Sequence, residues 1–199
     1  MSSRAVPLFP LRTVLLPGGP LPLRLFEPRY IDMVSRCMKD DSPFGVVLIA
    51  DGAEVGGDGV ARTAAVGTLA RIADWYQGTD GLLGITALGT ERFKLQSAEQ
   101  QSDGLNVGEV EILPAEASRS LPENYLGWPN LLRAVIEDLG RLYELVEKDY
   151  DDASWVSYRF AEILPLDMNA RQHCLELDDP LERLDFLRPM LRQVREGDA

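Results

Sequence analysis

The sequence changes character once along its length, and this change constrains the fold more than any other feature. Residues 1–114 contain short β-like runs separated by turns rich in glycine and proline. Residues from about 125 to 195 instead repeat apolar side chains at helical spacing. Strands and helices place side chains with different periods, so the two halves are expected to form different secondary structure. We therefore expect an α+β chain in which a β domain is followed by a helical bundle.

Three segments are predicted from this division. The first is a β domain over residues 1–114, the second a connector over residues 115–129, and the third a helical bundle over residues 130–199 that packs on the β domain. A chain of 199 residues buries enough surface to fold without disulfides or metal ions. Its two cysteines, Cys37 and Cys174, are therefore expected to be reduced thiols.

Seven strands and one inserted helix are expected in the β domain. The helix begins at Pro28, because proline favours the first turn of a helix. Gly89 and Thr90 are interpreted as a turn between two strands, and the glycine-rich residues 51–65 as a flexible loop. We expect the strands to form a small barrel or a folded sheet. The predicted strands span residues 6–11, 21–26, 44–49, 66–76, 82–88, 92–98 and 107–113.

An apolar stripe marks the first helix of the predicted bundle, and prolines and cap residues mark the others. A second helix is expected over residues 154–164, ending before Pro165. Asp167 and Asp179 are interpreted as N-caps of the next two helices. Pro189 is expected to bend or interrupt the last helix. The stripe of the first helix consists of Leu131, Leu132, Val135, Leu139, Leu142, Tyr143 and Val146.

The charge balance narrows the range of partners. The formal net charge is −12, and both halves of the chain are acidic. Nucleic acids and anionic membranes are bound through basic surface, so we expect neither as a partner. The longest apolar runs are far shorter than the ~20 residues of a membrane-spanning helix. No signal peptide is visible, and we therefore predict a cytoplasmic protein.

No set of residues has the spacing of a catalytic or cofactor site. The glycine-rich loops that bind nucleotide phosphates are absent. The single histidine, His173, lies beside Cys174, but neighbouring helical side chains point ~100° apart and make a poor catalytic pair. We therefore predict no cofactor, no metal ion and no enzymatic activity. An enzyme that uses two of the many carboxylates as acid and base is kept as an alternative.

Two adjacent aromatic residues, Trp75 and Tyr76, precede a glycine-rich turn. Aromatic side chains offer a large contact area at little entropic cost, which suits a binding surface. The alternative interpretation is that both residues close one end of the predicted barrel. The sequence leaves the two interpretations open.

Three phrases, in this order along the chain, resemble the N-terminal domain of Lon, the ATP-dependent protease. The first comprises residues 6–18 and 21–30, with the letters VPLFPLRTVLLPG and LPLRLFEPRY. The second comprises residues 66–72 (VGTLARI), then Asp80 and Gly81, then residues 88–93 (LGTERF). The resemblance extends over about residues 5–195. The third phrase consists of Leu164, Pro165 and Leu166, followed by Arg171, Gln172, Leu175, Glu176, Asp178, Arg183 and Leu184.

Six residues within the first two phrases have structural roles that their chemistry suggests. Pro28 sets the first helical turn, and Glu27 before it can accept hydrogen bonds as a cap. Glu27, Arg29 and Arg92 are expected to form an ion-pair or capping network, with a ligand site as the alternative. The remaining two, Gly67 and Gly89, are interpreted as turn or bulge positions.

The resemblance implies a PUA-like β fold with a C-terminal helical bundle, and a role in recognising damaged or unfolded polypeptides. The sequence contains neither the ATPase nor the protease module of full-length Lon. We therefore predict a stand-alone, non-catalytic polypeptide-binding protein, an adaptor in protein quality control. One specific folded protein partner is the alternative, and self-association is compatible with this domain type. The predicted contact residues are Trp75, Tyr76, Leu23, Leu25, Phe26 and Tyr30.

Overall fold

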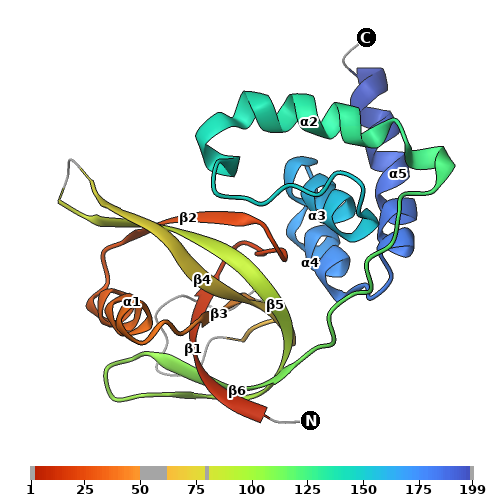
Figure 1. The fold of residues 1–199 in the computed structure, drawn as a ribbon. Coiled ribbons are helices and arrows are strands. Elements are labelled where there is room, and N and C mark those ends of the chain that lie inside the picture. Colours follow the sequence, from red (N-terminus) through yellow and green to blue (C-terminus); the bar gives the residue numbers. More distant parts are fainter. Residues whose placement is uncertain (1–2, 50–61, 79–80, 198–199) are drawn as a thin grey trace. The chain divides into compact units, whose positions relative to one another are not determined.

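The computed structural model describes residues 3–49, 62–78 and 81–197, and their fold is mixed α+β (Figure 1). The chain divides into two compact units, Met1–Pro114 and Ala115–Ala199. The first contains the sheet and is called the β unit below, and the second is called the helical unit. Most of the predicted flexible loop, and Asp80 of the predicted hairpin turn, lie outside the described residues.

The β unit contains one helix and a six-stranded sheet in the order β2-β5-β4-β3-β1-β6. β1 and β3 are parallel, and every other pair is antiparallel. β5 also pairs with β6, so the order of strands returns to β5. The elements are β1 (Ser3–Leu11), β2 (Pro20–Leu25), α1 (Pro28–Asp40), β3 (Phe44–Leu48), β4 (Val66–Gln77), β5 (Leu83–Gln100) and β6 (Asn106–Ile112).

The predicted turn at Gly89 and Thr90 is wrong, because β5 runs through both residues as one long strand (Figure 1). The register between β4 and β5 shifts between Thr68 and Ala70, because Leu69 alone lies opposite two residues of β5, Thr90 and Glu91, which form a bulge. A Cβ atom at Gly89 would collide with the backbone carbonyl of Leu16. The glycine therefore permits a close approach of two chain segments rather than a reversal of the chain.

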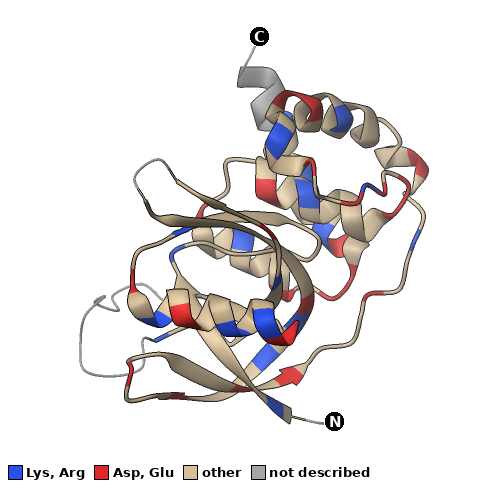
Figure 2. Cartoon of the chain, turned by 60° about the vertical axis from the view of Figure 1, so that its left-hand side comes forward, with Lys and Arg blue, Asp and Glu red and all other residues tan. Residues whose placement is uncertain are grey.

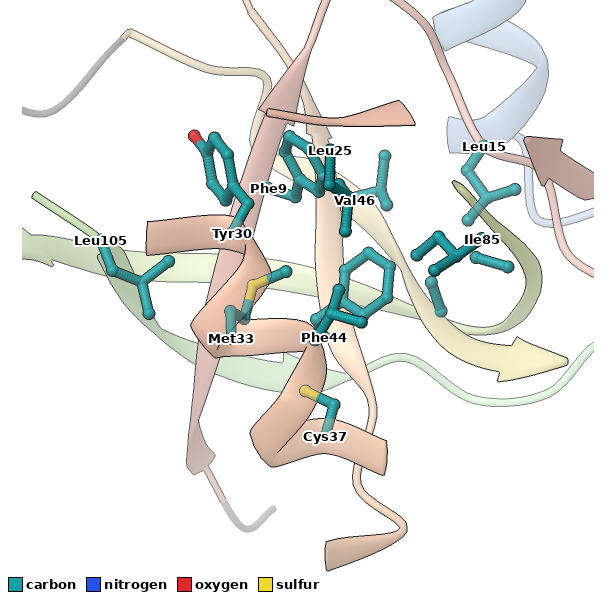
Figure 3. Packing of buried hydrophobic residues seen from close by; sticks show 13 residues of the cluster. Phe9, Leu15, Leu25, Tyr30, Met33, Cys37, Phe44, Val46, Ile85 and Leu105 are labelled. Atoms are coloured by element: carbon teal, nitrogen blue, oxygen red, sulfur yellow. The ribbon is translucent and has the colours of Figure 1, made fainter. Parts of the chain in front are cut away.

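Apolar side chains fill both faces of the sheet. Neighbouring residues of one strand belong to different clusters, as the alternation of strand side chains requires: Val46 lies in one cluster and Val47 in the other. The first cluster lies under α1, where the rings of Phe9 and Tyr30 stack with centroids 4.0 Å apart (Figure 3). Its members include Phe9, Leu15, Leu25, Tyr30, Met33, Val34, Cys37, Phe44, Val46, Ile85 and Leu105.

Cap residues and prolines set the helix ends of the helical unit as predicted. The carboxylate of Asp167 accepts a hydrogen bond from the Ala170 N–H at 2.7 Å, and α3 ends before Pro165. α5, by contrast, is one helix that continues through Pro189. The elements are η1 (Glu123–Tyr125), α2 (Trp128–Leu139), η2 (Gly140–Tyr143), α3 (Ala153–Ile163), α4 (Met168–Glu176) and α5 (Pro180–Gly197).

The apolar stripe predicted for the first helix of the bundle is only partly buried. Leu132 is fully buried, whereas Leu131 and Leu139 are exposed. The helix ends at Leu139, and Gly140 then adopts φ +52°, a left-handed conformation that glycine tolerates. The following turn, η2, is a 3-10 helix, so one helical phase cannot extend from residue 131 to residue 146. Among the described residues, no helix combines the length and the hydropathy that crossing a membrane requires.

Candidate functional site

The β unit exposes several large apolar side chains, and two of them are the predicted pair Trp75 and Tyr76. Trp75 is 58% exposed and Tyr76 48% exposed. The two residues are consecutive in β4, so their side chains point to opposite faces of the strand. The ring of Tyr76 covers Gly84 on β5, where a Cβ atom would collide with it. The pair therefore does not form one flat platform.

Trp75 lines a groove with a volume of about 520 Å³, which we call the β4 groove. Its walls are the end of α1, the turn from α1 to β3, and parts of β4 and β5. Met38, 42% exposed, adds a second apolar side chain to Trp75. The lining residues are Cys37, Met38, Asp41, Ser42, Pro43, Arg71, Ile72, Ala73, Asp74, Trp75, Thr90 and Glu91.

Three exposed carboxylates and one guanidinium surround this groove. The carboxylates are Asp41, Asp74 and Glu91, and the guanidinium is Arg71. Asp41 ends α1 in a left-handed conformation with φ 47°, and Asp74 accepts a hydrogen bond from the Trp75 N–H at 2.8 Å. Within the described residues, acidic and basic positions are mixed over the molecule (Figure 2), and at this groove the carboxylates outnumber the guanidinium.

The thiols and the histidine of the described residues do not form a reactive site. Burial raises the pKa of the Cys37 thiol, and it raises that of Cys174 to about 11. Thiols of this kind stay protonated at neutral pH and are weak nucleophiles. His173 is exposed, and its ring packs against Phe186 at 4.8 Å. No cluster of three or more metal-ligating side chains occurs in the described part of the chain.

The predicted contact residues of β2 and α1 do not join Trp75 at the β4 groove. Leu25 and Tyr30 are buried in the core beneath α1, with relative exposures of 1% and 7%. Their side chains offer no surface to a partner, so we correct their assignment to core residues. Leu23 is half-buried against the same core, and Phe26 is 70% exposed outside the groove.

The predicted network around Glu27 exists in part. Arg29 forms an ion pair with Glu27 at 2.6 Å and donates a hydrogen bond to the carbonyl of Gly104 at 2.8 Å. It thereby ties the start of α1 to the turn between β5 and β6. The side chain of Glu27 does not cap the helix; its backbone carbonyl accepts from the N–H of Tyr30 instead. Arg92 lies in β5, where its Cα pairs with that of Thr68.

Gly67 is a site of close contact within the sheet rather than a turn. A Cβ atom there would lie 2.5 Å from the carbonyl oxygen of Val46 and 2.6 Å from the ring of Phe93. Atoms cannot approach so closely, so β3 and β4 would have to separate. Gly67 thus preserves the close contact between β4 and β3.

Buried charges in the helical unit were not anticipated from the sequence. Arg183 is fully buried and donates to Glu116 at 2.5 Å, to Ser157 and to the carbonyl of Cys174. Its guanidinium also lies 3.6 Å from the centroid of the Tyr158 ring. One feature of the sequence could have indicated that Arg183 is buried: it lies three positions after Pro180, within the apolar face of α5.

A second buried ion pair lies within α3, and a tyrosine of η2 contacts it. Arg159 donates to Glu162 at 2.8 Å, and the Tyr143 hydroxyl donates to the same carboxylate at 3.0 Å. Burial raises the pKa of Glu162 and of Tyr143 above their usual values. The three side chains interact with one another inside the unit, which indicates a structural role.

Comparison with known proteins identifies the family to which the chain belongs. Residues 5–193 match the family described as the ATP-dependent protease La (LON) substrate-binding domain. The chain belongs to this family. Within it, the chain is similar to a solved Lon N-terminal domain protein from Xanthomonas campestris, with 37% identity, a TM-score of 0.76, and coverage of 94% of this chain and 98% of that chain. The predicted resemblance is confirmed.

More distant relatives share the fold or part of the length. The N-terminal domain of a Mycobacterium avium complex Lon protease superposes with a TM-score of 0.59 at 19% identity, covering 94% of this chain and 97% of that chain, a likeness of fold alone. Lon protease 2 from Myxococcus xanthus is 26% identical over 97% of this chain and 24% of that protein. Protein cereblon from Gallus gallus is 32% identical over 57% of this chain and 25% of that protein. The chain thus spans about a quarter of these curated relatives.

Proposed function

We propose that this chain is a non-catalytic polypeptide-binding protein that recognises unfolded or exposed segments of other proteins. Membership in a substrate-binding family supports the class of ligand. The binding site is proposed at Trp75, because its side chain is 58% exposed and lines a groove of about 520 Å³. An exposed tryptophan beside a hollow is the kind of anchor that dominates binding energy at protein interfaces.

The proposal includes an adaptor role in the cytoplasm. The sequence contains no glycine-rich phosphate-binding loop, so the binding step is expected to need no ATP. It also includes the PUA-like barrel description of the β unit. The return of the strand order to β5 supports that description. The proposed function does not include self-association.

The test is a fluorescence anisotropy titration of a labelled polypeptide that has been reduced and alkylated so that it cannot fold. The folded form of the same polypeptide serves as the control ligand, and no ATP is added. We expect saturable binding of the unfolded form alone. Absence of binding at tens of micromolar, about −6 kcal/mol, would reject the proposed function.

Two matched variants locate the contact. Trp75→Ala removes the exposed ring at the β4 groove, and Phe26→Ala removes an even more exposed ring outside it. We expect Trp75→Ala to weaken binding roughly 30-fold, the effect of losing an anchor of ~2 kcal/mol, and Phe26→Ala to leave it unchanged. Unchanged binding by Trp75→Ala, with unchanged circular dichroism, would place the contact elsewhere.

A further inference from the structure

The β4 groove runs beside a strand edge that has no partner strand in the described residues. β3 pairs with β4 only from Thr68 to Ala70. Beyond Ala70, the described pairings of β4 are with β5 alone, as far as Gln77. The other side of this stretch faces the turn from α1 to β3, which lines the groove. β4 therefore presents an open edge along the groove.

The hairpin that joins β4 to β5 decides which backbone groups lie on this edge. The Gly78 N–H donates to the Leu82 carbonyl at 2.8 Å, which makes that pair a hydrogen-bonded one. Hydrogen-bonded and non-hydrogen-bonded pairs alternate along antiparallel strands. Trp75 and Gln77 therefore fall in non-hydrogen-bonded pairs with β5. Their N–H and C=O groups point away from β5, toward the open edge.

Asp74 already accepts a hydrogen bond from one of these N–H groups. Its carboxylate accepts the Trp75 N–H at 2.8 Å, a contact that satisfies the donor while the edge is empty. Ala73 lies at a register shift between Ile72 and Asp74, where β4 bulges. Charged side chains and bulges at a strand edge hinder pairing with unselected strands. An incoming strand must displace Asp74, so it has to offer this carboxylate another partner.

The free side of β2 has a different character. β2 pairs with β5, and Pro20 and Pro22 lie two residues apart in it. Their spacing places both missing N–H groups on the same side of the strand. Because proline cannot donate to an incoming strand, that edge is unsuited to strand addition. β4 offers donors where β2 does not.

The charges around the groove indicate what kind of segment fits. Asp41, Asp74 and Glu91 are exposed, and within the described residues none of the three takes part in an ion pair. A basic side chain of an incoming strand would meet these carboxylates, whereas an acidic one would be repelled. The exposed ring of Trp75 can in addition pack against an apolar side chain or a cation.

We propose that an extended polypeptide segment bearing Lys or Arg adds to the open edge of β4 as an extra strand. Its backbone pairs with Trp75 and Gln77, and a basic side chain takes over the Asp74 carboxylate from the Trp75 N–H. This inference rests on the proposed polypeptide-binding function and specifies its mode and sequence preference. Strand addition supplies affinity through the main chain, and side chains supply specificity.

The experiment uses the full chain and four labelled peptides of equal length in the anisotropy titration. One alternates Lys and Val, one alternates Glu and Val, and the third is the Lys–Val peptide N-methylated at alternate residues along one edge. A fourth peptide, methylated along the other edge, is the matched control. We expect the Lys–Val peptide to bind about tenfold more tightly than the Glu–Val peptide, equivalent to ~1.4 kcal/mol. One of the two methylated peptides should lose about tenfold and the other little.

Protein variants test the same edge. Gln77→Pro removes a donor that points away from β5, so it should spare the hairpin and abolish the difference between the methylated peptides. Asp74→Asn keeps the acceptor for the Trp75 N–H but removes the charge. It should reduce the preference for the basic peptide about threefold, whereas Glu99→Gln, an exposed carboxylate of β5 outside the groove, should not.

The outcomes separate this inference from the function on which it rests. If the unfolded polypeptide binds but methylation of neither edge matters, strand addition is wrong and polypeptide binding stands. If methylation matters but charge does not, the basic preference is wrong. If neither the unfolded polypeptide nor any peptide binds, both proposals are rejected.

Discussion

The two units of the molecule fill their interiors in different ways. The β unit uses hydrocarbon side chains on both faces of its sheet, and glycines where strands approach closely. The helical unit buries arginines: Arg159 and Arg183 are the largest fully buried side chains described in the chain. The β unit therefore relies mainly on apolar packing, and the helical unit adds buried charge pairs to its apolar core.

This difference predicts which changes each unit tolerates. A buried charge is costly unless every polar atom has a partner, so removing one member of a pair is more damaging than removing an apolar group. A sheet packed around glycine is instead sensitive to the addition of a single carbon atom. Three stability measurements test the comparison, ordered by the size of the expected effect.

The largest effect is expected at Arg183. Arg183→Met keeps the volume of the side chain but leaves the Glu116 carboxylate, 6% exposed, without its ion pair. We expect the free energy of unfolding to fall by ~3–5 kcal/mol. Urea titration followed by far-ultraviolet circular dichroism measures this change.

The control is Arg119→Met, which removes an exposed ion pair with Asp179, where the side chains are 48% and 36% exposed. This loss should cost less than ~1 kcal/mol, because water screens the pair. If Arg183→Met were as mild as Arg119→Met, the buried pair would not hold the helical unit together.

A smaller effect is expected at Gly67 of the β unit. Gly67→Ala places a methyl group 2.5 Å from the carbonyl oxygen of Val46, and the strands must shift. We expect a loss of ~1–3 kcal/mol in the same titration. Gly127→Ala in the helical unit meets no atom within 4 Å and should change stability by less than ~0.5 kcal/mol. Equal effects at both positions would contradict the contrast between the units.

The smallest effect is a pH dependence at Glu162. Burial raises its pKa in the folded protein, although the nearby Arg159 and Tyr143 lower it. A folded-state pKa above the unfolded value gives stability that is present at low pH and is lost as the pH rises through the folded pKa. Glu162→Gln removes this titration while keeping an acceptor for both neighbours.

The measured quantity is the unfolding free energy of the natural protein minus that of Glu162→Gln, from about pH 4 to about pH 8. We expect the difference to decrease with rising pH, with a slope of at most ~1.4 kcal/mol per pH unit for one proton. A difference that increased with pH would contradict the assignment.

Local chemistry explains where sequence-based prediction succeeded. Helix α1 begins at Pro28, Asp167 caps α4, and Asp179 accepts the Leu181 N–H at 2.8 Å. Each of these features is an interaction within one turn of chain, so the residues that cause it are neighbours in the sequence. The family resemblance was likewise readable from short phrases, whose residues lie within the matched range 5–193.

Prediction failed where distant segments meet. Leu25 and Tyr30 have the composition of a contact surface, but packing under α1 buries them. The groove beside Trp75 depends on the end of α1 and on the point where β3 leaves β4. No pattern within β4 alone indicates that part of its edge is open.

The sequence by itself determined the two kinds of secondary structure, the helix ends and the family, because each depends on periodicity, caps or short ordered phrases. Only the tertiary structure decided that Gly89 accommodates a segment more than seventy residues before it along the chain. It also decided that Trp75 and Tyr76 face opposite ways across the sheet. In the helical unit it brings Arg183 to Glu116, 67 residues away. These contacts depend on strand register and on the packing of whole elements. Their energies come from pairs of residues that local sequence patterns do not connect.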